Sequence, residues 1–195
     1  RARYARALGL LRRDQQSPEE AFALLDRAAM LFGEIGETRR QVGTLLALGE
    51  LHLDLADSRA AFAAFDAALA VLERDEEGGA SLLVRAAQGA ALALVLLERG
   101  EEAIDTLSTV ASRVANPKDG LRLRDLQARI EISRLRFSRA VSFLREIPAA
   151  WMAESEPIAA AQSAVFLAQA LLEEATSSDE SSDSSATFAD LVEIL

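Results

Sequence analysis

The stretch Asp57-Ser58-Arg59-Ala60-Ala61-Phe62-Ala63-Ala64-Phe65-Asp66-Ala67-Ala68 decides how this chain folds. Within it, a small residue is followed four positions later by a large one and three positions after that by another small one: Ala61, Phe65 and Ala68. Such positions share one face of a helix, where small residues let a neighbouring helix approach and the large residue fills the space beside it. The stretch therefore predicts a helix that packs closely against other helices.

The same three-residue slot occurs four times, at intervals of roughly 40 residues, which is the mark of a repeat protein. The other three copies are Ala21/Leu25/Ala28, Ala103/Leu107/Val110 and Ala140/Leu144/Ile147. A further helical stretch precedes each slot, and in the first two copies it carries Leu8-Gly9 and Leu48-Gly49 at the same distance from the slot. Glycine inside a helix costs about 1 kcal/mol relative to alanine, so its presence twice at one register indicates close packing of helices.

This pattern resembles the tetratricopeptide repeat (TPR), which places Leu-Gly in its first helix and Ala, Phe and Ala in its second. The second copy matches well and the first nearly as well. The third and fourth depart, with Ala90-Ala91 and Gln127-Ala128 in place of Leu-Gly, and Val110 and Ile147 in place of the last alanine. The long period is similar to the long-repeat variety of the family. Over residues 2 to 176, the resemblance implies an all-α, right-handed α-solenoid of stacked antiparallel helix pairs.

Composition bounds the class of protein. Half of the 195 residues are hydrophobic and none is cysteine, so we expect a packed core and no disulfide or thiolate metal site. No apolar run reaches the roughly 18 residues that a membrane span needs, and no signal peptide is visible. We therefore expect a cytoplasmic location. The first residue is Arg1, which favours a fragment of a larger protein.

Charge is unevenly placed along the chain. The formal net charge is −10, and the residues from Glu146 to Leu195 include ten acidic side chains but no lysine or arginine. By contrast, the stretch from Lys118 to Arg145 carries eight basic and three acidic residues. The plain interpretation is solvated helix faces; the alternative is a basic surface for an acidic partner.

Turn and capping residues along the chain mark where the expected elements begin and end. Ser17-Pro18-Glu19-Glu20 predicts a capping box, and Ala149 to Glu156, which includes Trp151, predicts a linker. Thr176 to Ser185 contains only Ser, Thr, Asp and Glu and predicts a mobile loop. The expected segments are helix pairs near 2–35, 38–75, 80–116 and 119–148, a ninth helix at 157–175, an acidic loop at 177–186 and a short closing helix at 187–195.

The closing helix rests on Phe188, Leu191, Val192 and Leu195, which follow one another at helical spacing. A solenoid needs a cap over its last apolar surface, and capping is one interpretation of this segment. The other is that the acidic loop and helix fold onto the basic surface of the same molecule.

Catalytic motifs are absent from the sequence. His52 is the only histidine, lies four residues from Leu48 on the packing face, and is expected to be a core or half-buried residue. No second histidine completes a metal or acid–base set, and no phosphate-binding or nucleophile motif appears. We therefore expect no enzymatic activity, no metal and no cofactor. A turnover that is lost in His52→Ala would instead favour the hypothesis of an enzyme.

The resemblance also implies a peptide-binding groove lined by the first helix of each pair. Arginine suits carboxylate or phosphate by bidentate hydrogen bonds, and ordinary exposed charges are the competing interpretation. A clamp for chaperone tails is not predicted, because Leu10 and Ala47 stand where that class of protein has asparagine. The groove residues implied are Arg3, Arg6, Arg13, Glu50, Asp54, Arg85, Gln88, Leu92, Arg122, Asp125 and Arg129.

The sequence thus favours a protein–protein interaction scaffold that binds a peptide or helix of a partner, with an acidic partner favoured by the arginines. The alternative is a regulatory or sensor segment of a larger signalling protein, such as a kinase or transcription regulator. No membrane partner is expected, and the net charge disfavours nucleic acid, although Arg122 to Arg145 could contact phosphates. Pairing of Ala-rich helices between two chains stays open.

Overall fold

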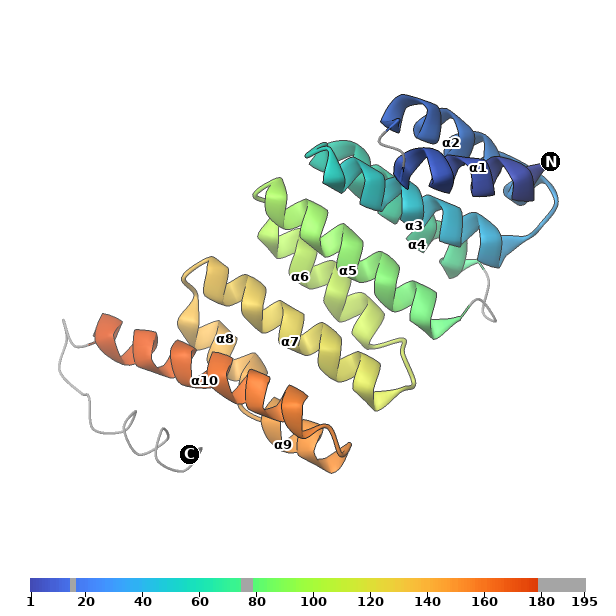
Figure 1. The fold of residues 1–195 in the computed structure, drawn as a ribbon. Coiled ribbons are helices and arrows are strands. Elements are labelled where there is room, and N and C mark those ends of the chain that lie inside the picture. The colour runs from blue at the N-terminus through green and yellow to red at the C-terminus, as the bar shows by residue number, and fades with distance from the viewer. Residues whose placement is uncertain (15–16, 75–78, 179–195) are drawn as a thin grey trace. The chain divides into compact units, whose positions relative to one another are not determined.

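A computed structural model describes residues 1–14, 17–74 and 79–178, which form ten α-helices and no strand (Figure 1). The all-α class predicted from the sequence is confirmed for these residues. The helices divide between two compact units, Arg1–Thr106 and a second unit that begins at Leu107. Helix α6 (Gly100–Ala111) crosses the boundary between the units.

Unit 1 is built of antiparallel helix pairs that stack on one another (Figure 1). Each helix packs on the next, and the first helices of neighbouring pairs, α1 with α3 and α3 with α5, also touch. We call α1, α3 and α5 the first helices of this unit. The bounds are α1 (Ala2–Asp14), α2 (Pro18–Glu34), α3 (Thr38–Asp54), α4 (Ser58–Glu73) and α5 (Ala80–Leu96).

The repeated slot is the core of the fold. All twelve of its side chains are at most 3% exposed, from Ala21 at 0% to Val110 at 3%. The prediction that the slot residues are buried is therefore confirmed in all four copies, but in the fourth copy Ile147 begins a separate helix and does not share the helix of Ala140 and Leu144.

Glycines make room for the large member of the slot. A Cβ added at Gly9 would lie 2.8 Å from Leu25 Cγ, and one added at Gly49 would lie 2.6 Å from Phe65 Cζ. A third glycine, Gly89 of α5, faces the same ring, because its Cβ would lie 2.4 Å from Phe65 Cε1. Phe65 thus fits between two helices that approach closely because each lacks a side chain there.

The turns within pairs share one backbone device. Ala56, Glu98, Leu135 and Ser155 all have positive φ, near 60°. The residue after each donates its N–H to the carbonyl five residues earlier, and a turn of this kind satisfies the free carbonyls at a helix end. Asp57, which follows Ala56, caps the start of α4 by accepting a hydrogen bond from the N–H of Ala60 at 3.0 Å.

Unit 2 contains α7 (Pro117–Ser133), α8 (Phe137–Leu144), α9 (Ile147–Ala153) and α10 (Pro157–Ser178). Helix α10 packs on α8 and α9 and touches α7. The core of this unit joins Leu144, Ile147 and Trp151 to Leu167 and Leu171 of α10. Helices α7 and α10 therefore lie on a shared layer of apolar side chains.

Two sequence predictions were wrong in this unit. The expected linker from Ala149 to Glu156 is mostly helix α9, and Trp151 is only 4% exposed. Proline tolerates the first turn of a helix, so Pro148 lies at the start of α9 instead of ending a longer helix. The helix expected at 157–175 continues to Ser178, so the start of the predicted 177–186 loop is helical.

The predicted capping box was also wrong, because the Ser17 side chain accepts no hydrogen bond at the start of α2, where Pro18 occupies the first turn. The rest of the predicted loop and the predicted closing helix at 187–195 lie outside the described residues.

Candidate functional site

The side chains on the first helices of unit 1 form the candidate site, which we call the first-helix face. Of the residues predicted from the sequence, Arg3, Asp54, Arg85 and Leu92 are exposed, and Arg6, Glu50 and Gln88 are half-buried. Arg13 lies in α1, but its side chain is outside the described residues. Because α3 contacts both α1 and α5, its residues stand in the middle of this face.

An ion pair bridges two of the predicted residues. Arg85 of α5 donates a hydrogen bond from Nη2 to Oε1 of Glu50 of α3 at 2.7 Å, and the side chains remain 56% and 43% exposed. Exposed pairs of this kind contribute about 0–1 kcal/mol. The bridge therefore orients Arg85 while leaving its guanidinium accessible to a ligand carboxylate.

Arg6 of α1 reaches toward α3 at a position without a side chain. Its Nη2 lies 3.8 Å from where a Cβ on Gly43 would be. The Nε of Arg6 is buried without a hydrogen-bond partner, and Arg6 makes no ion pair with any residue in the described ranges. A guanidinium held at a bare stretch of helix backbone can receive a carboxylate from outside the chain.

Apolar surface adjoins the polar one on α5. Leu92 and Leu96 are 51% and 56% exposed and lie one helical turn apart. The first-helix face of unit 1 therefore offers cations on α1, an ion pair between α3 and α5, and an aliphatic pair on α5.

In unit 2, the predicted residues of α7 contact α10. Oδ1 of Asp125 accepts a hydrogen bond from the Ser163 hydroxyl at 2.7 Å, and Ser163 is 1% exposed. The guanidinium of Arg129 lies over the Phe166 ring, 5.1 Å from its centroid. Both residues thus fasten α7 to α10, a role that the sequence did not predict for them.

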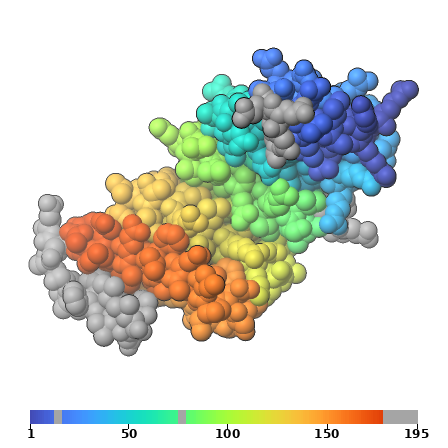
Figure 2. Space-filling model, viewed as in Figure 1, coloured from blue at the N-terminus to red at the C-terminus, as the bar shows by residue number. Residues whose placement is uncertain are grey.

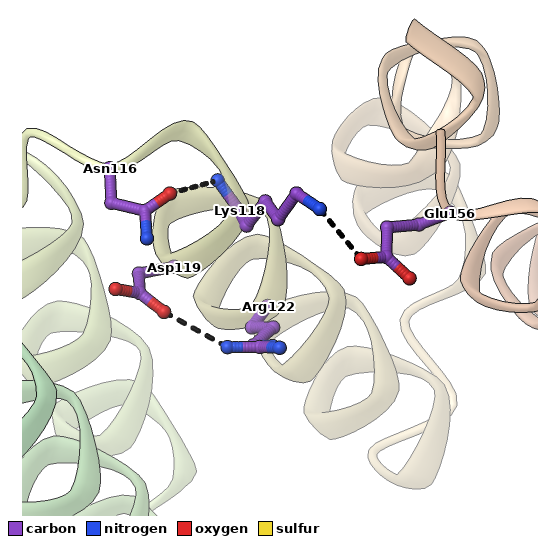
Figure 3. Close-up of polar contacts among 5 residues, drawn as sticks. All are labelled: Asn116, Lys118, Asp119, Arg122 and Glu156. Atoms are coloured by element: carbon purple, nitrogen blue, oxygen red, sulfur yellow. Dashed lines mark hydrogen bonds and ion pairs between the residues drawn. The ribbon is translucent and has the colours of Figure 1, made fainter. Parts of the chain in front are cut away.

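The start of α7 is fastened to the start of α10 by a second polar cluster, shown in Figure 3. Oδ1 of Asn116 accepts a hydrogen bond from the N–H of Lys118, and the Lys118 Nζ donates to Oε1 of Glu156 at 2.6 Å. Arg122, the remaining predicted residue, donates to Asp119 at 3.0 Å. The hydrogen bond from Lys118, together with the lysine charge, holds the pKa of Glu156 below its usual value.

We expect Glu156→Gln to lower the stability of unit 2 at neutral pH and to have progressively less effect as the pH falls through the lowered pKa of Glu156. A carboxyl whose folded-state pKa is depressed stabilises the fold above its unfolded value, about 4.3, and this contribution is lost as the pH falls through the folded value. Urea midpoints followed by the fluorescence of Trp151, the single tryptophan, test this. Glu154→Gln is the control, and a pH-independent difference for Glu156→Gln would contradict the prediction.

The structure also reveals an open apolar face on α10, which the sequence argument overlooked. Ile158, Val165 and Leu172 recur at intervals of seven residues and are 74%, 66% and 54% exposed. Between them lie Ala161, exposed, and Ala168, half-buried. The seven-residue spacing of these apolar side chains could have indicated this face. The groove predicted from the repeat resemblance, however, includes only the first helices of the recognised pairs.

The residues considered for chemistry have structural roles. His52 is half-buried, as predicted, and its ring stacks on Phe22 with centroids 4.3 Å apart. Glu131 of α7, which sequence reasoning missed, is fully buried, with Arg139 Nε 2.9 Å from its Oε1 and Arg134 Nη1 3.6 Å from its Oε2. Within the described part of the chain, no cluster of side chains could hold a metal ion.

The fold is that of TPR-like repeat proteins of known structure. A kinesin light chain from Podosopora anserina with nearly identical TPR-like repeats superposes with a TM-score of 0.68 at 16% identity, covering 98% of this chain and 93% of that one. A second structure of the same protein gives 0.67. A signal-transduction ATPase with numerous domains from Pyrococcus horikoshii, which carries a tetratricopeptide repeat sensor, gives 0.66 at 11% identity.

That match covers 97% of this chain and 30% of the ATPase. No protein-family model and no curated protein matches the sequence. The resemblance inferred from the slots is therefore confirmed as a fold, a TPR-like α-solenoid of stacked antiparallel pairs. No helix in the described ranges is long and apolar enough to span a membrane.

Proposed function

We propose that this chain is a protein-interaction module that binds a peptide or helix of a partner protein on the first-helix face of unit 1. The observation that carries the proposal is the position of Arg6 beside Gly43. The guanidinium is held near α3 without an ion-pair partner among the described residues, so it suits a carboxylate supplied from outside.

Gly43 strengthens this argument because the packing of the chain does not require it. Unlike Gly49 and Gly89, it faces no core side chain, and its nearest neighbour would be Arg6 at an ordinary contact distance. Glycine in a helix interior costs about 1 kcal/mol. Retaining such a residue on an accessible helix suits the close approach of a ligand backbone.

The chemistry of the face narrows the ligand. Arg3 and Arg6 favour acidic side chains or a terminal carboxylate, and the aliphatic pair Leu92 and Leu96 favours apolar side chains at the other end. A segment that combines carboxylates with aliphatic residues would match both, consistent with the acidic partner favoured by the sequence.

We expect Gly43→Ala to stabilise unit 1 by about 0.5–1 kcal/mol and yet to weaken partner binding. The methyl group fits within the chain but occupies space that the ligand uses. Urea unfolding measures the first effect. The second is measured by capture from native lysate with quantitative mass spectrometry, followed by titration with the captured protein.

Gly120→Ala in α7 is the matched control, because an added Cβ there meets nothing within 4 Å. It should stabilise the fold without changing binding, whereas Arg6→Glu should abolish capture in a folded protein. Unchanged capture by both Arg6→Glu and Gly43→Ala would place the binding site elsewhere.

A second candidate is a sensor segment of a larger signalling protein. It is favoured by the likeness to a tetratricopeptide repeat sensor that forms only part of its own chain. In that case, the ligand of the face would be another part of the parent protein. A full-length transcript that encodes only this domain would count against this candidate.

A further inference from the structure

We infer that the open face of α10 in unit 2 is a docking surface for the end of this chain, the segment at 187–195. The surface consists of Ile158, Val165 and Leu172, with Ala161 and Ala168 between them. This inference is independent of ligand binding on unit 1.

The face is open along α10 because no helix in the described part of the chain packs on it. The contacts of α10 run to α7, α8 and α9, and they use buried side chains such as Ser163, Leu167 and Leu171. Helix α10 lies at the surface in the view of Figure 2, where it is coloured orange to red. Aliphatic side chains that are aligned along a helix and more than half exposed mark a surface that another element covers.

The order of the chain identifies that element. Helices α1, α3 and α7 are each packed against the helix that follows them directly, whereas α10 has no following helix among the described residues. The sequence continues beyond Ser178 with an acidic stretch and then with Phe188, Leu191, Val192 and Leu195. These four lie at positions i, i+3, i+4 and i+7, which share one face of a helix.

Length and register agree with docking. The residues between Ser178 and Phe188 can span about 30 Å when extended, and Val165 lies only about 20 Å back along the α10 axis. Phe188 and Leu195 have the same spacing in sequence as Val165 and Leu172. An antiparallel arrangement therefore matches Phe188 with Leu172 and Leu195 with Val165.

The alanines on α10 suit this occupant. Ala161 and Ala168 leave shallow positions between the aliphatic side chains, so a second helix could approach closely and insert its larger residues. A segment joined to α10 by a short stretch of chain also has an effective concentration in the millimolar range. It would outcompete a second copy of the chain at ordinary protein concentrations.

The chain has no cysteine, so a single engineered pair reports on this contact without ambiguity. We expect Val165→Cys/Leu195→Cys to form an intramolecular disulfide at least about tenfold faster than the control pair Leu135→Cys/Leu195→Cys. Leu135 is 75% exposed in the turn after α7, so both substituted positions are accessible. A disulfide needs Cα atoms within about 7 Å, and the twofold difference in loop length would by itself change the rate only about threefold.

Equal rates for the two pairs would overturn the inference, and so would disulfides formed mainly between chains, which would assign the face to a second copy. A labelled peptide of residues 187–195 provides a second measurement on the full chain. It should bind the Leu191→Asp/Val192→Asp variant at least about tenfold more tightly than the unmodified chain, because the competing segment is removed. Equal binding to both chains would contradict docking, and Arg6→Glu should change neither result.

Discussion

Phe65→Ala is expected to lower the free energy of unfolding of unit 1 by about 3–5 kcal/mol, the range for truncating a buried phenylalanine. The ring is 2% exposed and lies between Gly49 of α3 and Gly89 of α5. Its loss leaves a cavity between helix backbones that are already close, so the site cannot collapse readily. Urea unfolding followed by far-ultraviolet circular dichroism measures the change.

Phe62→Ala provides the matched control. Phe62 lies on the same helix but is half-buried, with the guanidinium of Arg99 over its ring at 5.2 Å. Its truncation should cost clearly less than that of Phe65. A similar loss for both would mean that Phe65 has no special place in the packing.

Gly49 and Gly89, which face the Phe65 ring, provide a second test of the same packing. In the presence of Phe65, Gly49→Ala and Gly89→Ala should each destabilise by about 1–3 kcal/mol through overpacking, despite the higher helix propensity of alanine. In the Phe65→Ala background, the same methyl groups would enter the vacated space and restore part of the loss. A double-mutant cycle measures this coupling, and additive effects would contradict it.

The sequence was sufficient to predict the slot, because a period of roughly 40 residues and a fixed i, i+4, i+7 pattern state which residues must be buried together. The sequence was insufficient to predict the role of Gly89, because the repeat signature places its helix glycine at the position of Ala91. The glycine faces the large residue of the preceding pair, and a contact between pairs is not encoded at a fixed distance from one slot. The same limit applies to α9, because the fourth expected pair ended at 148 although Pro148 also suits the first turn of a helix.

The candidate site was predictable as a set of surface positions but not as a set of contacts. Glu50 and Arg85 pair with each other, Asp125 accepts a hydrogen bond from Ser163, and Arg129 lies over Phe166. These contacts join neighbouring helices. Which residues meet depends on the axial displacement of one helix relative to the next. A sequence gives helix faces, but this displacement is set by tertiary packing.

Glu131 illustrates the other limit, because its surroundings come from two elements. A charged residue in a basic stretch is expected on a solvated helix face. The Glu131 carboxylate is instead fully buried near the start of α8. Burial follows from the turn between α7 and α8, where the backbone carbonyl of Glu131 also accepts the N–H of Arg136 at 2.9 Å.

Arg139→Leu is accordingly expected to destabilise unit 2 by about 3 kcal/mol, the lower end of the range for removing one partner of a buried ion pair. The Nε of Arg139 lies 2.9 Å from the Glu131 carboxylate, while Arg134 is farther away, at 3.6 Å. Without Arg139, the buried carboxylate loses the nearer of these two arginines. Because Arg139 itself is 49% exposed, its own desolvation adds little. Urea unfolding followed by Trp151 fluorescence measures the loss.

The second substitution Glu131→Leu, added to Arg139→Leu, should recover most of that loss, because it replaces the stranded charge with an apolar side chain. Arg124→Leu is the control: Arg124 is exposed on the same helix α7 and has no ion pair among the described residues, so its effect should stay within about 0.5 kcal/mol. If the double variant were no more stable than Arg139→Leu alone, the cost would lie in lost packing of the arginine stem. The buried carboxylate would then be tolerated without its partner.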